Sequence, residues 1–155
     1  DSNDNYLYTI YSFNSNYYVR ARYGDTFKTI AKHLGLSYRS LAKYNERDKH
    51  DILNEGEVVY LKKKRSKAPK EYKNKLHVVR AGESMYTIAQ MYGIRLKYLY
   101  KMNRLSPEYQ IKVGDSLRVR WLFITHRLDR TDMGDKETRT YQNKKTDKEG
   151  GKIEQ

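Results

Sequence analysis

The sequence predicts an α+β protein made of two tandem strand–helix–helix–strand (βααβ) modules, joined by a basic linker and followed by a disordered C-terminal tail. The first observation behind this prediction is a repeat: a shift of 58 residues aligns residues 18–62 with residues 76–120 without a gap. The second is the spacing inside each copy, where apolar residues recur at helical intervals between short runs rich in β-branched and aromatic residues. We call the copies module 1 (18–62) and module 2 (76–120).

Ten aligned positions are identical, and chance similarity would not keep them in one register. They are Arg22/Arg80, Gly24/Gly82, Thr29/Thr87, Ile30/Ile88, Ala31/Ala89, Gly35/Gly93, Leu41/Leu99, Lys43/Lys101, Asn45/Asn103 and Gly56/Gly114.

Both modules are predicted to have the same elements in the same order. In module 1 a strand (18–22) runs into a turn at Gly24, and Asp25 or Thr26 then supplies the oxygen that caps a helix. This first helix is expected to end at Gly35 in a left-handed conformation. The counterparts in module 2 lie 58 residues later.

The second helix is predicted to begin after Ser37, a good N-cap, and to stop near Asn45. Its counterpart in module 2 follows Arg95, which is no capping residue, so we expect a weaker start there. A loop through Gly56 leads into a closing strand (58–61). We expect the first and closing strands to pair antiparallel beneath the helices.

Composition limits the classes of protein. The chain has 155 residues, a net charge of +13 and no Cys, so disulfides, thiolate metal sites and a cysteine nucleophile are excluded. Its longest apolar run, 121–124, is far shorter than the ~20 residues of a membrane span. The sequence begins at Asp1 rather than Met, so we expect a processed or excised piece, with any signal peptide or upstream domain out of view.

Three segments lie outside the modules. Residues 1–17 form an N-terminal segment in which 6–13 are predicted to be a strand. The linker 63–75 lies in a stretch (62–75) with eight basic residues and one acidic residue, so we expect a solvated, self-repelling spacer. Residues 121–155 are a short apolar run followed by a charged tail that we predict to be disordered.

The repeated pattern resembles that of a LysM domain. The resemblance rests on Gly-acid-Thr/Ser, Ile-Ala, Gly, Leu, Asn and Gly-acid at fixed spacing, twice in one chain. The residues are Gly24-Asp25-Thr26, Ile30-Ala31, Gly35, Leu41, Asn45 and Gly56-Glu57, and then Gly82-Glu83-Ser84, Ile88-Ala89, Gly93, Leu99, Asn103 and Gly114-Asp115. Residues 44–48 and 107–115 are also similar to the C-terminal part of glucosaminidases of the Bacteroidetes type.

The resemblance implies non-catalytic modules that bind glycans containing N-acetylglucosamine, such as peptidoglycan or chitin. The sugar is expected in a shallow groove between the first strand–helix turn and the loop before the last strand. Carried onto this sequence, the expected glycan-binding residues are Gly24, Asp25, Thr26, Phe27, Leu53, Gly82, Glu83, Ser84, Met85, Tyr86, Asn103 and Ile111.

The chemistry of these residues suits an N-acetyl sugar, which carries an amide, hydroxyls and apolar faces. Short polar side chains and backbone beside glycine can bind the polar groups. The larger side chains can offer apolar surface to methyl and ring faces. They are Phe27, Leu53, Met85, Tyr86 and Ile111.

Several of these residues also have a structural alternative. Phe27 and Met85 fit the core pattern of the first helices. Thr26 and Ser84 can serve only as N-caps, although capping and sugar contact are compatible. Asn103 and its counterpart can satisfy loop backbone instead of touching a ligand. Module 1 differs in one respect, because its loop 46–51 is far more charged than 104–109, so module 1 is expected to bind differently or not at all.

An enzyme is not expected within this chain. Its four His form no pair at metal-ligand spacing, Gly-x-Ser-x-Gly is absent, and no repeated pair of carboxylates suits a glycosidase. We therefore predict no catalytic residue, no metal and no cofactor.

The alternative function is binding of nucleic acid or another polyanion. Residues 62–125 carry a charge of +12 with interleaved Tyr, which can hold phosphates in a salt-sensitive way. The basic residues lie mainly in a linker, however, and no nucleic-acid motif is present. We therefore favour an exported protein of the periplasm or cell surface. Its expected partners are a glycan and an upstream catalytic domain, such as that of a peptidoglycan hydrolase.

Overall fold

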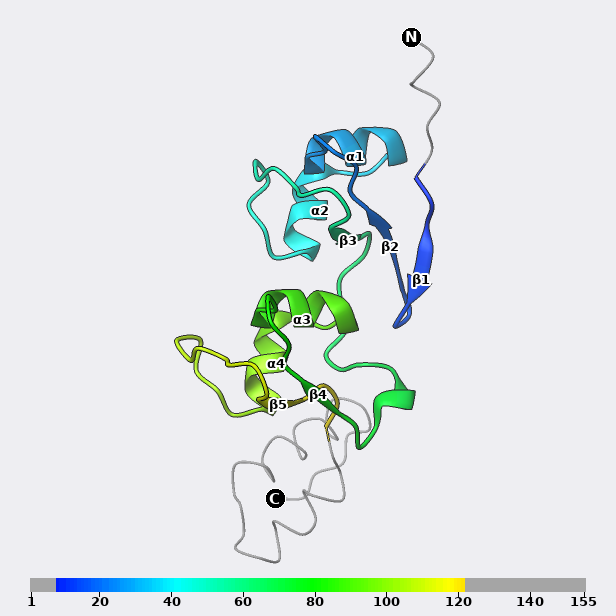
Figure 1. Ribbon diagram of the computed structural model, residues 1–155. Coiled ribbons are helices and arrows are strands. Elements are labelled where there is room, and N and C mark those ends of the chain that lie inside the picture. Colours follow the sequence, from blue (N-terminus) through cyan, green and yellow to red (C-terminus); the bar gives the residue numbers. More distant parts are fainter. Residues whose placement is uncertain (1–7, 122–155) are drawn as a thin grey trace, which may run out of the picture. The chain divides into compact units, whose positions relative to one another are not determined.

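A computed structural model of the chain describes residues 8–121 (Figure 1). Of residues 121–155, predicted as a short apolar run and a disordered tail, only Trp121 lies within the described residues. In chain order the elements are β1 (Tyr11–Phe13), β2 (Asn16–Arg20), α1 (Phe27–Leu34), α2 (Tyr38–Tyr44), β3 (Val58–Tyr60), the 3-10 helix η2 (Lys70–Tyr72), β4 (Leu76–Val78), α3 (Met85–Tyr92), α4 (Leu96–Met102) and β5 (Ser116–Arg118). The mixed α+β class and the repeated βααβ order are confirmed.

The strands form two antiparallel sheets. In module 1, β2 pairs with β3, with Val19 opposite Val59, and in module 2, β4 pairs with β5, with His77 opposite Leu117. The expected antiparallel pairing of first and closing strands is therefore confirmed. Both first strands end two residues before their predicted ends, because the next residues, Ala21 and Val79, bond to the turns at Gly56 and Gly114 rather than to the closing strands.

Module 1 carries a third strand that module 2 lacks within the described residues. Strand β1 pairs with β2 in the order β1-β2-β3 and occupies the end of the run predicted as a strand over 6–13. The hairpin turn consists of Asn14 and Ser15, which have φ values of 51° and 56°. Positive φ at both central positions is typical of a tight hairpin turn whose twist matches the flanking strands.

The helices begin and end for the predicted reasons. Thr26 and Ser84 are the N-caps of α1 and α3, and each accepts a hydrogen bond from the backbone N–H three residues on. Gly35 and Gly93 end these helices with φ values of 71° and 67°. Arg95, as expected, makes no side-chain cap for α4.

Each module has its own small core between its helices and its sheet. The fully buried apolar residues of module 1 are Val19, Ala21, Phe27, Ile30, Ala31, Leu41, Ala42, Leu53 and Val59. Those of module 2 include Val79, Met85, Ile88, Ala89, Ile94, Leu99, Met102, Leu117 and Val119. Burying these side chains is the main favourable term that holds each module together.

The linker differs from the expected solvated spacer. Lys64 is only 2% exposed, and its Nζ lies 2.6 Å from Glu46 Oε1 and 2.6 Å from Gln90 Oε1. Ala68 is fully buried and donates its backbone N–H to Val119 O. The composition indicates mutual repulsion among the basic residues of the linker. One of these residues, Lys64, is instead paired with a carboxylate from module 1 and an amide from module 2.

The two modules are in direct contact. Gln90 of α3 reaches module 1, where its Nε2 donates to Asn45 Oδ1 (3.1 Å) and to Val58 O (3.0 Å). In return Tyr60 Oη donates to Gln90 O at 2.7 Å, and Tyr86 Oη donates to Asn45 O at 2.8 Å. Buried hydrogen bonds of this kind fix orientation, because breaking one leaves a polar group unsatisfied away from water.

Candidate functional site

The first wall of the predicted groove is a tight turn with the same geometry in both modules. Gly24 and Gly82 have φ values of 83° and 85°, a conformation that glycine adopts without a steric penalty. The acidic residue that follows folds back onto the turn. Asp25 Oδ2 accepts from Arg22 N at 2.6 Å, and Glu83 Oε1 accepts from Arg80 N at 2.9 Å.

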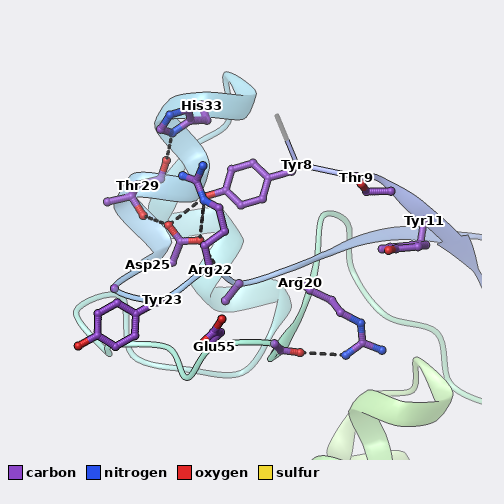
Figure 2. A pocket seen from close by; sticks show the side chains of 13 residues that line it. Tyr8, Thr9, Tyr11, Arg20, Arg22, Tyr23, Asp25, Thr29, His33 and Glu55 are labelled. Atoms are coloured by element: carbon purple, nitrogen blue, oxygen red, sulfur yellow. Dashed lines mark hydrogen bonds and ion pairs between the residues drawn. The ribbon is translucent and has the colours of Figure 1, made fainter. Parts of the chain in front are cut away.

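In module 1 this carboxylate is the centre of a polar cluster, which Figure 2 shows from close by. Tyr8 Oη donates to both oxygens of Asp25 at 2.9 and 2.8 Å, and Thr29 Oγ1 donates at 2.8 Å. Arg22 lies beside it, with Nε 3.6 Å from the carboxylate and its guanidinium over the Tyr8 ring. The side chain of Asp25 is thereby held in place as part of the turn.

The pKa values follow from these contacts. Burial alone would raise the pKa of Asp25, but the donors from Arg22, Thr29 and Tyr8 stabilise the charged form and hold the pKa below its usual value. Burial, together with the bond to Asp25, raises the pKa of Tyr8 to about 12, so this phenol remains a donor at neutral pH.

The carboxylate of module 2 has different partners. Glu83 Oε1 lies 2.8 Å from Nε2 of His77, and Nδ1 of His77 lies 2.8 Å from Tyr92 Oη. Burial opposes ionisation of Glu83, but the bonds from Arg80 N and His77 lower its pKa overall. His77 on the first strand of module 2 therefore binds the acidic residue of its turn, as Tyr8 from the added N-terminal segment does in module 1.

The capping interpretation of Thr26 and Ser84 is confirmed. Thr26 Oγ1 accepts from Thr29 N at 3.2 Å, and Thr29 Oγ1 accepts from Thr26 N at 3.0 Å. Ser84 and Thr87 form the same reciprocal box. Ser84 is nevertheless exposed and Thr26 half-buried, so capping leaves sugar contact open to both.

Three side chains predicted to offer apolar surface to a sugar do not do so. Phe27 is 0%, Leu53 3% and Met85 5% exposed, because each faces the core of its module. The core alternative is therefore confirmed for Phe27 and Met85. Leu53 N donates to Asp25 O at 3.1 Å, which joins the two walls of module 1 at their base.

Asn103 and its counterpart Asn45 tie each second helix to the closing strand. Asn103 Nδ2 donates to Leu99 O (2.8 Å) and Arg118 O (2.9 Å), and its Oδ1 accepts from Arg118 N. Asn45 makes the same bonds to Leu41 and Tyr60. The backbone-satisfying alternative is therefore confirmed.

The remaining predicted residues lie apart from one another. Ile111 is half-buried on the second wall of module 2. Tyr86 faces module 1, where its hydroxyl bonds to Asn45 O, and burial raises its pKa to about 12. Tyr86 therefore belongs to the contact between modules as well as to helix α3.

Beside the first wall of module 1 lies a pocket of about 810 Å³ (Figure 2). Of the predicted site residues it contains Gly24 and Asp25. Its other side chains were not predicted from the sequence, and they come from β1 and the residues before it, the end of β2 and the loop after it, helix α1 and the turn before β3. They include Tyr8, Tyr11, Arg20, Tyr23, His33 and Glu55. Part of this lining could have been predicted from the alternation on β2, where Val19 is buried and Arg20 is exposed.

Neither a metal centre nor a membrane span is found within residues 8–121. In that part of the chain no group of three or more His, Asp or Glu side chains is arranged to hold a metal ion. No helix within the same range is long and apolar enough to span a bilayer.

Two kinds of known protein are similar to part of this chain. An autolysin of Enterococcus faecalis is 29% identical over 101 residues, which are 62% of this chain and 13% of the autolysin. Two solved structures of the spore cortex-lytic enzyme SleL are also similar. The structure from Bacillus cereus is 27% identical and covers 68% of this chain. The structure from Bacillus megaterium is 16% identical and covers 66% of this chain. Each match covers 22% of the enzyme and has a TM-score of 0.29. The chain thus spans only a small part of each relative.

The LysM domain family model matches residues 19–62 and 77–120, one match in each module. LysM domains are non-catalytic and bind glycans that contain N-acetylglucosamine, peptidoglycan among them. Because these two matches cover more than half of the sequence, the chain belongs to the LysM domain family.

Proposed function

We propose that this chain binds peptidoglycan through its N-acetylglucosamine units and anchors a cell-envelope protein, such as a peptidoglycan hydrolase, to that polymer. The observation that supports this most is the repeated geometry of the first wall. Both modules present the glycine turn at the solvent-exposed surface, next to an acidic residue and an N-cap. In module 1 the second wall stays accessible, since Ile52 is 72% exposed.

The groove is preformed in module 1. A backbone bridge between Thr26 and Ile52 and the bond from Leu53 N to Asp25 O hold the two walls together. A rigid site loses little conformational entropy when a sugar binds, which raises affinity for a given set of contacts. Backbone at a glycine turn also lets the amide of an N-acetyl group approach closely.

The acidic residues of the groove have a structural task. Asp25 and Glu83 are engaged by turn amides and by Tyr8 or His77, and these bonds keep their pKa values low. A general acid in a glycosidase needs a raised pKa instead. This supports a binding role for the modules and leaves hydrolysis to another domain.

The autolysin similarity supports the context. The relative is named an autolysin, and this chain matches a small portion of it. We therefore place this chain outside the cell, at the wall, in a longer protein whose catalytic domain lies upstream. Chitin-type glycans are the second ligand to compare, because they share the N-acetylglucosamine unit.

The test is a pull-down on nucleic-acid-free peptidoglycan and on chitin, at low salt and at roughly 0.5 M salt, where exposed charge pairs are screened. Soluble N-acetylglucosamine oligomers serve as competitors. The groove variants are Ile52→Arg and its aligned counterpart Gln110→Arg, both at exposed positions. Leu36→Arg, exposed and outside the groove, is the control that adds the same charge.

Binding that resists salt, yields to the oligomers and falls in the double groove variant would support the proposal. The polyanion alternative predicts the opposite: each added Arg strengthens binding, including Leu36→Arg, and salt abolishes it. Such a result would reject glycan recognition, whereas a preference for chitin over peptidoglycan would reject only the choice of polymer.

A further inference from the structure

A second hollow, of about 770 Å³, lies where the two modules meet. One side is the sheet of module 1, on the face opposite its helices, with Tyr18 and Arg20 of β2. The other side is helix α3 of module 2, with Tyr86 and Met91. Neither module has this site alone, because each contributes only one wall.

The walls of this inter-module cleft are held in place by buried bonds. Gln90 donates to Asn45 and Val58 and accepts from Tyr60 through its backbone carbonyl. Lys64 is buried between Glu46 and Gln90 and joins linker and modules in one network. A cleft with such walls is open before any ligand arrives, so binding carries little cost for ordering it.

The lining combines flat rings with charged rim groups. Phe13, Tyr18 and Tyr72 are half-buried there, and Met91 is 45% exposed. Aromatic faces bind the C–H faces of sugar rings, and carboxylate and guanidinium groups bind hydroxyls and amides. Arg20 is exposed at the rim, where it donates to Gly56 O at 2.9 Å and keeps further donors for a ligand. This combination suits a carbohydrate better than a purely apolar ligand.

The inter-module cleft also adjoins the pocket beside the turn of module 1. Arg20, Glu55 and Gly56 line both hollows. The Gly24 turn belongs both to the predicted groove and to this pocket. A glycan strand long enough to pass from the groove over this turn can therefore continue along the shared rim into the inter-module cleft. The resulting surface is longer than either hollow.

From this geometry we infer that the inter-module cleft is an additional saccharide site, which extends the grip of module 1 along one glycan strand. This inference rests on the proposed function and adds that affinity depends on the length of the glycan. A short oligomer fills one groove, whereas a long oligomer gains the contacts of the inter-module cleft as well. Contacts added to one bound strand raise affinity without a second association event.

The test uses the full chain in calorimetric titrations with an N-acetylglucosamine trimer and with an octamer. Met91→Trp fills the inter-module cleft from an exposed helical position. Leu36→Trp, 41% exposed and outside both hollows, is the matched control. Glu55→Ala removes a charge from the shared rim without adding bulk and gives an independent second variant. Far-UV circular dichroism verifies that each variant folds.

The expected result is that Met91→Trp weakens octamer binding about tenfold and leaves trimer binding unchanged, with a smaller loss for Glu55→Ala. The inference is overturned if octamer affinity is unchanged in both variants, or if the affinities for trimer and octamer fall equally. In either case the proposed glycan binding itself still stands. Failure of the unmodified chain to bind either oligomer at high salt overturns both this inference and the proposed function. The Leu36→Trp variant must behave like the unmodified chain.

Discussion

Module 1 and module 2 keep the same turn, the same capping box and the same Asn, but they stabilise them with different neighbours. The acidic residue of module 1 is bound by a tyrosine from the added N-terminal segment, and that of module 2 by a histidine from its own first strand. The repeat thus preserved the backbone geometry of the groove while the supporting side chains changed. The features common to both modules, the glycine turn and the capping box, therefore indicate the glycan site better than the side chains that differ.

The second wall differs as well. In module 1, Leu53 is buried and its amide bonds to the first wall, whereas its counterpart Ile111 is half-buried. Among the described residues of module 2 no backbone bond joins Ile111 N to Glu83 O. The two grooves are consequently not equivalent, and we expect them to bind the same glycan with different affinity.

The charged loop 46–51 also differs from its counterpart 104–109. The charge of this loop predicted altered glycan binding by module 1, but in the structure the charged side chains pair with other residues of the chain. Arg47 pairs with Asp51 and Glu57, and Glu46 bonds to Lys64 and to the backbone N–H of Leu96. Glu46 thereby supplies the cap that Arg95 cannot give to α4, so module 2 depends on module 1 for the start of a helix.

The largest expected effect concerns the paired Asn residues. Asn45→Ala should lower the free energy of unfolding by about 3 kcal/mol, and Asn103→Ala by about 2 kcal/mol. Both changes unpair the second helix and closing strand, but Asn45 is buried and also accepts from Gln90 of module 2. Urea unfolding measures both values, and equal losses would show that the bond to Gln90 contributes nothing.

The glycines that end α1 and α3 form a second matched pair. Alanine in the left-handed conformation costs about 1–2 kcal/mol at either position. A Cβ at Gly35 meets open space, whereas one at Gly93 lies 3.2 Å from Tyr60 Oη and 3.3 Å from Asn14 Cβ. Gly93→Ala should therefore reduce thermal stability more than Gly35→Ala. The reverse order would contradict the close packing of the modules.

The cap across the modules is the third comparison. Glu46→Ala should speed hydrogen exchange of the Leu96 amide roughly fivefold, because that N–H loses its acceptor. Arg104→Ala is the control, since Arg104 and Glu46 occupy aligned positions with φ values of 54° and 56°. A similar change at Leu96 in both variants would mean that backbone strain rather than the lost cap is responsible.

The smallest effect is the pH dependence of the two carboxylates. Both have folded-state pKa values below their usual values, so their contribution is present above about pH 4 and is lost as pH falls through the folded-state pKa. Asp25→Asn should flatten the acid limb of the stability curve more than Glu83→Gln, because Asp25 has more donors. Chemical denaturation between neutral and acidic pH tests this, and equal slopes for both variants would reject it.

Tyr8 offers a sharper form of the same test. Tyr8→Phe removes the hydroxyl that donates to Asp25 while Arg22 N and Thr29 remain, so the pKa of Asp25 should rise toward its usual value. NMR titration of the Asp25 carboxyl gives the shift directly. Glu83 serves as the internal reference, and a shift of its pKa would point to a global rather than a local change.

Local chemistry allowed much of this molecule to be predicted. The register of the repeat, the caps at Thr26 and Ser84 and the left-handed Gly35 and Gly93 all depend on a few neighbouring residues, and all were confirmed. The burial of Phe27 and Met85 was predicted as the core alternative to sugar contact, because their spacing fits the apolar face of a helix. The burial of Leu53 was not predicted, because Leu53 lies in a loop that has no helical periodicity.

The sequence by itself therefore determined the duplicated βααβ fold, the turns of the groove and the family, because short-range spacing specifies helices, caps and turns. Tertiary structure alone decided the contact between modules, the burial of Lys64 and the lining of the inter-module cleft. Those features rest on residues that are not repeated, such as Gln90 and Tyr60, which are distant in sequence and meet only once both modules are folded. Periodicity cannot reveal a contact that occurs once.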